Sequence, residues 1–140
     1  ADLLSLVSYS DPLMRYLLWE KGSEAEYASR LRALFVYTCA EHLDRGWPLL
    51  GGVAGSRLAA VACVMSPGVR GGSELLKGAW SRTIKIIGPR AAERLDAYGA
   101  LRDSLRPADP HFLHHLRWRT SDGEGERVLS FTSRSSPAIL

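Results

Sequence analysis

The amino-acid sequence predicts a single-domain α+β protein in which a sheet is flanked by helices. Apolar residues recur at helical spacing along several segments, two apolar segments joined by a short turn are typical of a hairpin, and a further strand follows a proline-rich linker. A chain of 140 residues suits one domain of ordinary size. We expect residues 1–132 to form this domain and the Ser-rich residues 133–140 to form a flexible tail.

The first part of the chain is expected to be helical. A short apolar segment at the start has helix or turn potential. Asp11 and Pro12 then form a helix-start signal, because an aspartate can cap a helix and proline fits its first position. Ser23 and Glu26 match a capping box, so a longer helix should begin there and run to about Arg45.

The middle of the chain is expected to contain a hairpin and a pair of helices. Residues 49–53 and 57–65 are typical of two strands joined by a tight turn at Gly55. The second strand is almost entirely apolar, which predicts a central strand buried on both faces. Helical spacing follows, and Gly88 before Pro89 predicts the end of one helix and the start of the next.

Charge, apolar segment length and cysteine content indicate which kinds of partner and which cellular compartment to expect. Lys and Arg exceed Asp and Glu by a net charge of only +3. The basic residues of the predicted helix pair are interrupted by Glu93 and Asp96, so we expect a solvated face and no nucleic-acid partner. The apolar strand is too short to span a membrane. Cys39 and Cys63 lie in apolar segments, which predicts reduced, buried thiols in a cytoplasmic protein.

The segment after the proline-rich linker, residues 111–118, contains the candidate catalytic residues. A strand there would place His114 and His115 on opposite faces. Imidazole titrates near neutral pH, so either histidine is a candidate general base; a hydrogen-bonded structural histidine is the alternative for both. We expect no metal site, because neighbouring strand positions point apart and no second group of ligands is evident.

The order of these elements resembles the GNAT superfamily of N-acetyltransferases over residues 1–118. Three segments carry the resemblance: DPLMRYLL at residues 11–18, the strand that ends in Pro-Gly at residues 61–68, and PADPHFLHHL at residues 107–116. The resemblance implies a mixed, mainly antiparallel sheet that opens between its fourth and fifth strands, and residues 107–116 would lead into the fourth. Acetyl-CoA would lie in that opening, and an amine would attack its thioester directly.

The resemblance also implies a function and a cofactor site. The chain would be an acyl-CoA-dependent N-acyltransferase that transfers an acetyl group to a primary amine of a small molecule or peptide. The strand backbone at Leu116 and Trp118 would bind the pantetheine arm of acetyl-CoA. Gly123 and Gly125 would bind the pyrophosphate, because close backbone amides at a helix start favour an anion.

The segment after Trp118 departs from the family pattern. Glu124 stands where the family has a basic residue, and a carboxylate 4 Å from a phosphate charge costs about 4 kcal/mol at an effective dielectric of 20. Arg127 stands where the family has Gly or Ala, and the family's closing helix and strands have no evident counterpart. The alternative is therefore a non-catalytic GNAT-like binding or dimerisation module. In that case the strand at residues 111–118 would present an unpaired edge to a partner or to a second copy in a homodimer.

Overall fold

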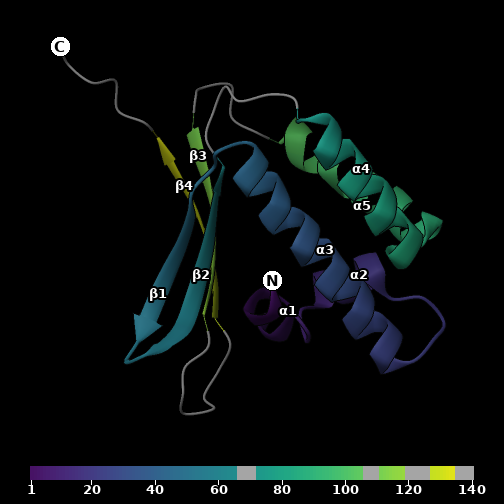
Figure 1. Cartoon of the computed structure of the whole chain (residues 1–140), viewed down its shortest axis with the longest axis horizontal. Coiled ribbons are helices and arrows are strands. Elements are labelled where there is room, and N and C mark those ends of the chain that lie inside the picture. Colours follow the sequence, from purple (N-terminus) through teal and green to yellow (C-terminus); the bar gives the residue numbers. More distant parts are fainter. Residues whose placement is uncertain (66–71, 106–110, 119–126, 135–140) are drawn as a thin grey trace.

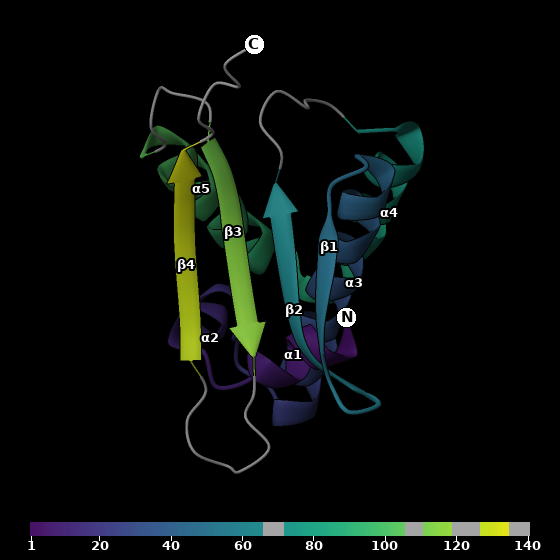
Figure 2. The ribbon, with the colours of Figure 1, turned by 90° about the vertical axis from the view of Figure 1, so that its left-hand side faces the viewer.

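A computed structural model describes residues 1–65, 72–105, 111–118 and 127–134, the last two segments as backbone strands. Within these segments the elements are α1 (Asp2–Val7), α2 (Pro12–Leu18), α3 (Glu24–Asp44), β1 (Leu49–Ala54), β2 (Arg57–Met65), α4 (Glu74–Ile87), α5 (Pro89–Ser104), β3 (His111–Trp118) and β4 (Arg127–Arg134). The strands form one layer, and the helices lie together on one side of it (Figures 1 and 2). The α+β prediction is confirmed, with the helices on one face of the sheet.

Local capping interactions start α2 and α3 where the sequence predicts. The Asp11 side chain accepts a hydrogen bond of 2.8 Å from the backbone N–H of Leu13. At α3 the Ser23 hydroxyl accepts from the Glu26 backbone N–H at 3.2 Å. The Glu26 carboxylate in turn accepts from the Ser23 backbone N–H at 2.6 Å, which completes the capping box.

Gly88 separates α4 from α5 and confirms the predicted break. Its φ of 88° and ψ of 157° lie in a region that side chains other than glycine rarely adopt. Pro89 then occupies the first position of α5, where its missing N–H has no helical partner to lose.

The four strands follow one another across the sheet in the order β1-β2-β3-β4. Every described pair is antiparallel, so the implied mixed sheet is antiparallel throughout this part of the chain. Gly55, with a φ of 62°, lies in the turn between β1 and β2. The prediction that β2 is a central strand is confirmed, because it pairs with β1 on one side and β3 on the other.

Both faces of β2 are buried near its end. Cys63 is 6% exposed and belongs to the core formed with the helices. Ala62 and Val64, which alternate with Cys63, are 7% and 6% exposed. The helical side of that core is supplied by Leu4, Leu17, Leu18, Tyr27, Leu31, Phe35, Ile87, Ala91 and Ala92.

The edges of the sheet differ from the expected ones. The strand at His111–Trp118, expected to have an unpaired edge, pairs with β2 on one side and with β4 on the other. The prediction of a free edge there was wrong, because the next strand of the chain folds back on it, as consecutive strands commonly do.

The last strand, β4, reaches Arg134, two positions beyond the expected domain boundary at residue 132. Residues 135–140 of the expected tail lie outside the described residues.

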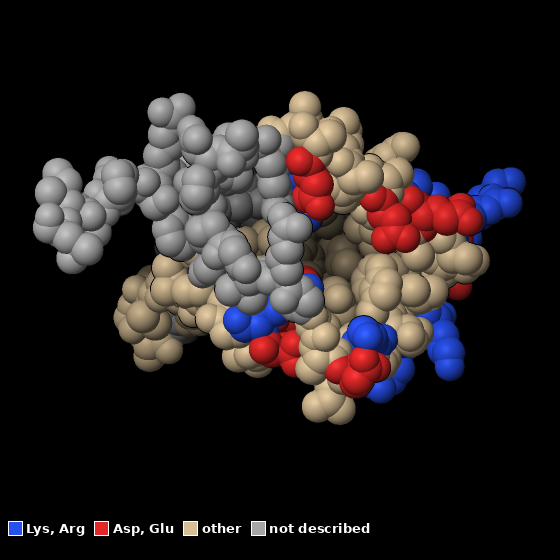
Figure 3. Space-filling model, turned by 90° about the horizontal axis from the view of Figure 1, so that it is seen from above, with Lys and Arg blue, Asp and Glu red and all other residues tan. Residues whose placement is uncertain are grey.

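The surface carries charges of both signs. On the face seen from above, Lys and Arg groups lie beside Asp and Glu groups over the described part of the chain (Figure 3). Ion pairs also form between neighbouring helix positions, such as Glu41 with Arg45 at 2.8 Å and Glu74 with Lys77. No described helix is both long and apolar enough to cross a membrane.

Candidate functional site

The two candidate catalytic histidines lie on β3, inside the sheet. His115 pairs with Cys63 and His114 pairs with Val64. Directly paired residues of an antiparallel ladder share a face of the sheet. Position 115 therefore lies on the face covered by helices, to which Cys63 belongs, and position 114 lies on the opposite face. The register agrees with the predicted alternation of the two histidines.

The positions expected to bind the cofactor are only partly described. Leu116 pairs with Ala62, and Trp118 pairs with Ala60. Gly123 and Gly125 lie outside the described residues. The structure therefore brings Leu116 and Trp118 onto the same strand as the histidines and says nothing about the glycines.

The backbone of β3 is used by its neighbours on both sides. Its ladder with β4 runs without a register shift from the pair His111–Arg134 to the pair Trp118–Arg127. The ladder with β2 covers Leu113 to Trp118. A strand offers its N–H and C=O groups alternately to its two sides, so a ligand that binds this backbone must replace part of one ladder. The opening implied beside this strand is not present between β3 and β4.

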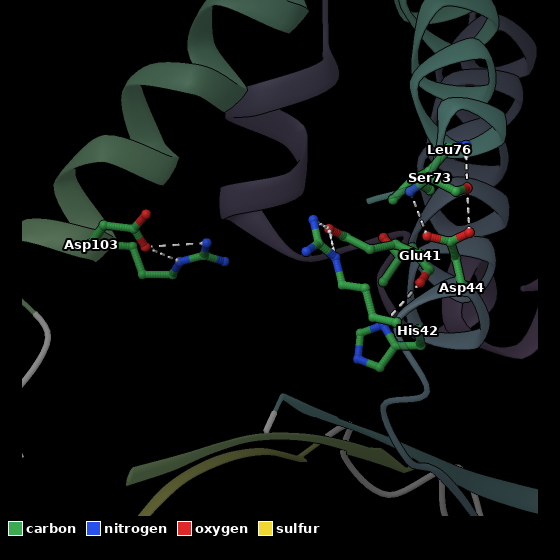
Figure 4. A network of polar contacts seen from close by, with 9 residues as sticks. Glu41, His42, Asp44, Ser73, Leu76 and Asp103 are labelled. Atoms are coloured by element: carbon green, nitrogen blue, oxygen red, sulfur yellow. Dashed lines mark hydrogen bonds and ion pairs between the residues drawn. The ribbon is translucent and has the colours of Figure 1, made fainter. Parts of the chain in front are cut away.

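A polar network at the end of α3 lies close to the start of the sheet (Figure 4). The Nδ1 atom of the buried His42 lies 2.9 Å from the backbone oxygen of Thr38, which can only accept a hydrogen bond. Nδ1 therefore donates, and in the neutral ring Nε2 carries no proton. The ring of Trp47 meets His42 edge-on with the centroids 5.3 Å apart. Neither His42 Nε2 nor Trp47 Nε1 has a hydrogen-bond partner in the described structure.

Asp44 connects this end of α3 to the start of α4 (Figure 4). Its carboxylate accepts hydrogen bonds from the Ser73 hydroxyl at 2.5 Å and the Ser73 backbone N–H at 3.0 Å. The hydroxyl bond and then the backbone bond hold the pKa of Asp44 below its ordinary value. Ser73 itself caps α4 by accepting from the Leu76 backbone N–H at 3.3 Å. This chain of bonds connects the end of α3 to the start of α4.

A second polar centre, here called the Arg15 cluster, consists of Tyr9, Arg15, Trp19, Glu24 and Tyr27. The Arg15 guanidinium lies 4.6 to 5.1 Å from the centroids of the three aromatic rings. It also donates two hydrogen bonds to Glu24, at 2.8 and 2.9 Å. The Arg15 bond is the main reason that the pKa of Glu24 is lowered, with the Tyr9 hydroxyl contributing next. The cluster holds α2 against the start of α3.

The Arg15 cluster was not predicted from the sequence. Arg15 and Glu24 belong to different helices, so no helical spacing connects them. The available signal was the gathering of three tyrosines and a tryptophan around one arginine between residues 9 and 27, of which all but Tyr16 belong to the cluster. Such a set is typical of a cation–π contact, and here the chain itself supplies the cation.

Arg94, expected on a solvated helix face, has a structural contact. Its guanidinium donates to the backbone oxygen atoms of Leu17 at 2.9 Å and Trp19 at 3.3 Å. These are carbonyls at the end of α2, which a helix leaves without internal partners. Arg94 therefore fastens α5 to the end of α2.

Comparisons with protein families, with curated proteins and with solved structures each found no match to this chain. Within the described part of the chain, no three His, Cys, Asp or Glu side chains lie together in a way that could hold a metal ion.

Proposed function

We propose that this chain is an acyl-CoA-dependent N-acyltransferase that transfers an acetyl group from acetyl-CoA to a primary amine of a small molecule or peptide. The observation that supports the proposal is the position of β3. It is an interior strand that follows a hairpin and a helix pair, and its adjacent histidines lie on opposite faces of the sheet. The resemblance to the GNAT superfamily implies the same order of elements and the same place for the reacting strand.

The proposed reaction needs one group that accepts a proton. The amine nitrogen attacks the thioester carbonyl carbon, the carbon–sulfur bond breaks, and the CoA thiolate leaves with the electron pair. The nitrogen loses one proton and the thiolate gains one. A neutral imidazole at His114 or His115 has the basicity to accept the first of these protons at neutral pH. Because the two histidines lie on opposite faces, only one of them can serve a given amine.

A second candidate function is a non-catalytic binding or dimerisation module with a GNAT-like fold. The observation that favours it is the unbroken ladder between β3 and β4, which occupies the backbone that would hold the pantetheine arm. Glu124, in the segment expected to bind pyrophosphate, adds a like charge to the site.

Calorimetry with acetyl-CoA on the full chain separates the two functions. We expect weak binding by the wild type and tighter binding by Glu124→Arg, because an attractive charge replaces a repulsive one. Glu93→Arg, which makes the same charge change on an exposed position of α5, serves as the control and should not change the affinity. If neither the wild type nor Glu124→Arg gives heat with millimolar acetyl-CoA, the non-catalytic function is favoured. If Glu124→Arg binds more weakly than the wild type, Gly123 and Gly125 are not the cofactor loop.

A further inference from the structure

A cavity lies where the end of α2 meets the start of α5. It has a volume of about 420 Å³ and is lined by Trp19, Glu20, Lys21, Arg90 and Arg94. That volume falls in the range of small-molecule sites. The end of α2 and the α4–α5 junction lie on the side of the helices that faces away from the strands (Figure 1). The cavity is therefore separate from β3 and from the proposed acyl-transfer chemistry.

The acidic residue in the cavity is already balanced by two arginines. One oxygen of Glu20 lies 3.6 Å from Arg30, and the other lies 3.9 Å from Arg94. Arg94 is also held in place by its hydrogen bonds to the backbone of Leu17 and Trp19. The carboxylate charge of Glu20 is therefore offset within the protein.

Two of the lining cations have no such partner. Lys21 and Arg90 make no hydrogen bond and no ion pair within the described residues, although both line the cavity. Two unpaired positive charges at one concave site create a potential that attracts an anion. A phosphate monoester carries close to two negative charges at neutral pH and offers three acceptor oxygens, which matches two cationic donors.

One wall of the cavity is aromatic and fixed in orientation. The ring of Trp19 packs against the ring of Tyr27, and the two ring centroids are 5.7 Å apart. The Arg15 guanidinium also packs over this ring, with its Cζ atom 5.1 Å from the ring centroid. Trp19 nevertheless remains 37% exposed, so part of it is open toward the cavity. A planar group of a ligand can pack against this surface with little loss of side-chain entropy, because the indole is already ordered.

We propose that this cavity is a binding site for a small phosphate monoester that carries a planar ring. Its phosphate contacts Lys21 and Arg90, and its ring packs against Trp19. Arg94 and Arg30 keep the Glu20 carboxylate from repelling the phosphate. The site is independent of acetyl-CoA binding at β3.

The test is calorimetry on the full chain at low, fixed ionic strength. The probes are phenyl phosphate, adenosine monophosphate, methyl phosphate and inorganic phosphate. We expect phenyl phosphate or adenosine monophosphate to bind at least several-fold more tightly than the two phosphates without a ring, and the tighter of them shows whether the ring is attached directly or through a sugar. Arg90→Gln and Lys21→Gln should each weaken this binding about tenfold, the effect of one charge-assisted hydrogen bond. Glu20→Gln should tighten it, because the charges of Arg30 and Arg94 that Glu20 now offsets would then add to the positive potential of the cavity.

Arg82→Gln is the matched control. It removes one positive charge from an exposed position of α4 outside the cavity, where Arg82 makes no hydrogen bond or ion pair with the described residues. The proposal is overturned if Arg82→Gln weakens binding as much as Arg90→Gln does, because the attraction is then general. It is also overturned if phosphates with and without a ring bind equally, or if none binds at millimolar concentration. Lys21 lies in the loop between α2 and α3, so Lys21→Gln tests the site even if Arg90→Gln disturbs α5.

Discussion

At the scale of single residues, Gly88 is the position where the backbone depends most on one amino acid. Its φ and ψ of 88° and 157° are open to glycine and disfavoured for all other residues. A Cβ atom there would meet Glu20 at 3.7 Å, an ordinary contact distance. The difficulty for any other residue at this position is therefore in the backbone and does not come from crowding.

Replacing Gly88 by alanine should therefore destabilise the protein by about 1–3 kcal/mol, the cost of holding one residue in a strained backbone region. Gly99→Ala is the matched control. Gly99 lies inside α5 with no atom near its absent Cβ, so alanine there should stabilise by about 0.5–1 kcal/mol. Urea unfolding followed by circular dichroism measures both changes. Equal effects of the two substitutions would contradict the backbone argument.

Glu24 is a residue whose charge couples stability to pH. Its pKa lies below the ordinary value of 4.5, chiefly because Arg15 donates to it. A lowered pKa means that the folded state favours the ionised form, so the stabilisation is complete above pH 4.5 and is lost as the pH falls below it. Asp44 and Glu26 have lowered pKa values as well and act in the same direction.

We expect the melting temperature to fall as the pH decreases through the acidic range, and we expect Glu24→Gln to reduce that fall. The amide does not titrate, so its melting temperature should be lower than that of the wild type at pH 7 and approach it in acid. Glu93→Gln, at an exposed position of α5, should leave the pH dependence unchanged. Parallel curves for the wild type and Glu24→Gln would show that this ion pair does not carry the effect.

At the scale of elements, the ends of helices and the β1–β2 hairpin were predictable, and the neighbours of β3 were not. Ser23 with Glu26, and Gly88 with Pro89, act within one turn of the chain, so the sequence shows them directly. The pairing of β3 with β2 was not predictable in this way, because α4 and α5 separate the two strands along the chain and no local signal connects them. An open edge was expected at β3 because the segment after Trp118 departs from the family pattern, but the next strand of the chain, β4, pairs there.

The functional residues also include some that were predictable from the sequence and some that were not. The alternation of His114 and His115 follows from the period of two along a strand and was predictable. The cavity lining was not, because residues 19–21 and Arg90 meet only when α5 packs on the end of α2. A partial signal was present in Arg90 and Arg94, which are four residues apart and therefore share a face of α5.

The capping box of α3 offers a test at this scale. Ser23→Ala removes the acceptor for the Glu26 backbone N–H and should cost about 1 kcal/mol of stability. Ser29→Ala, at an exposed interior position of the same helix, should be neutral or slightly stabilising because alanine is the better helix former. Chemical unfolding of both variants gives the comparison. If Ser29→Ala lowered the free energy of unfolding as much as Ser23→Ala, the effect of removing a serine hydroxyl would not depend on the helix cap.

At the scale of the whole molecule, the helices and the sheet meet in one core that encloses Cys63. The α3 helix packs against α1, α2 and α4, and α1 contacts β2 and β3. Exposure of Cys63 therefore requires the two layers to separate. Cys39, on α3, is only partly buried and does not need that separation.

Cys63 should react with a thiol reagent far more slowly than Cys39 in the folded protein, because a buried thiol becomes accessible only when the structure opens. Single variants Cys39→Ser and Cys63→Ser assign the two rates in a spectrophotometric thiol assay. In denaturant the rates should become similar. Fast labelling of Cys63 under native conditions would show that β2 is not enclosed.

The pairing of β2 with β3 also determines the order in which the chain can fold. The β1–β2 hairpin joins neighbouring segments of the chain. In contrast, α4 and α5 separate β2 from β3 along the chain, so β2 can pair with β3 only after both helices have been synthesised. During synthesis at the ribosome, the apolar β2 emerges well before its second partner, and one of its edges stays unsatisfied throughout that interval. Closing this long loop adds to the contact order, so the formation of the β2–β3 ladder is expected to be the slow step of folding. Until it is complete, that edge of β2 is open to pairing with other chains.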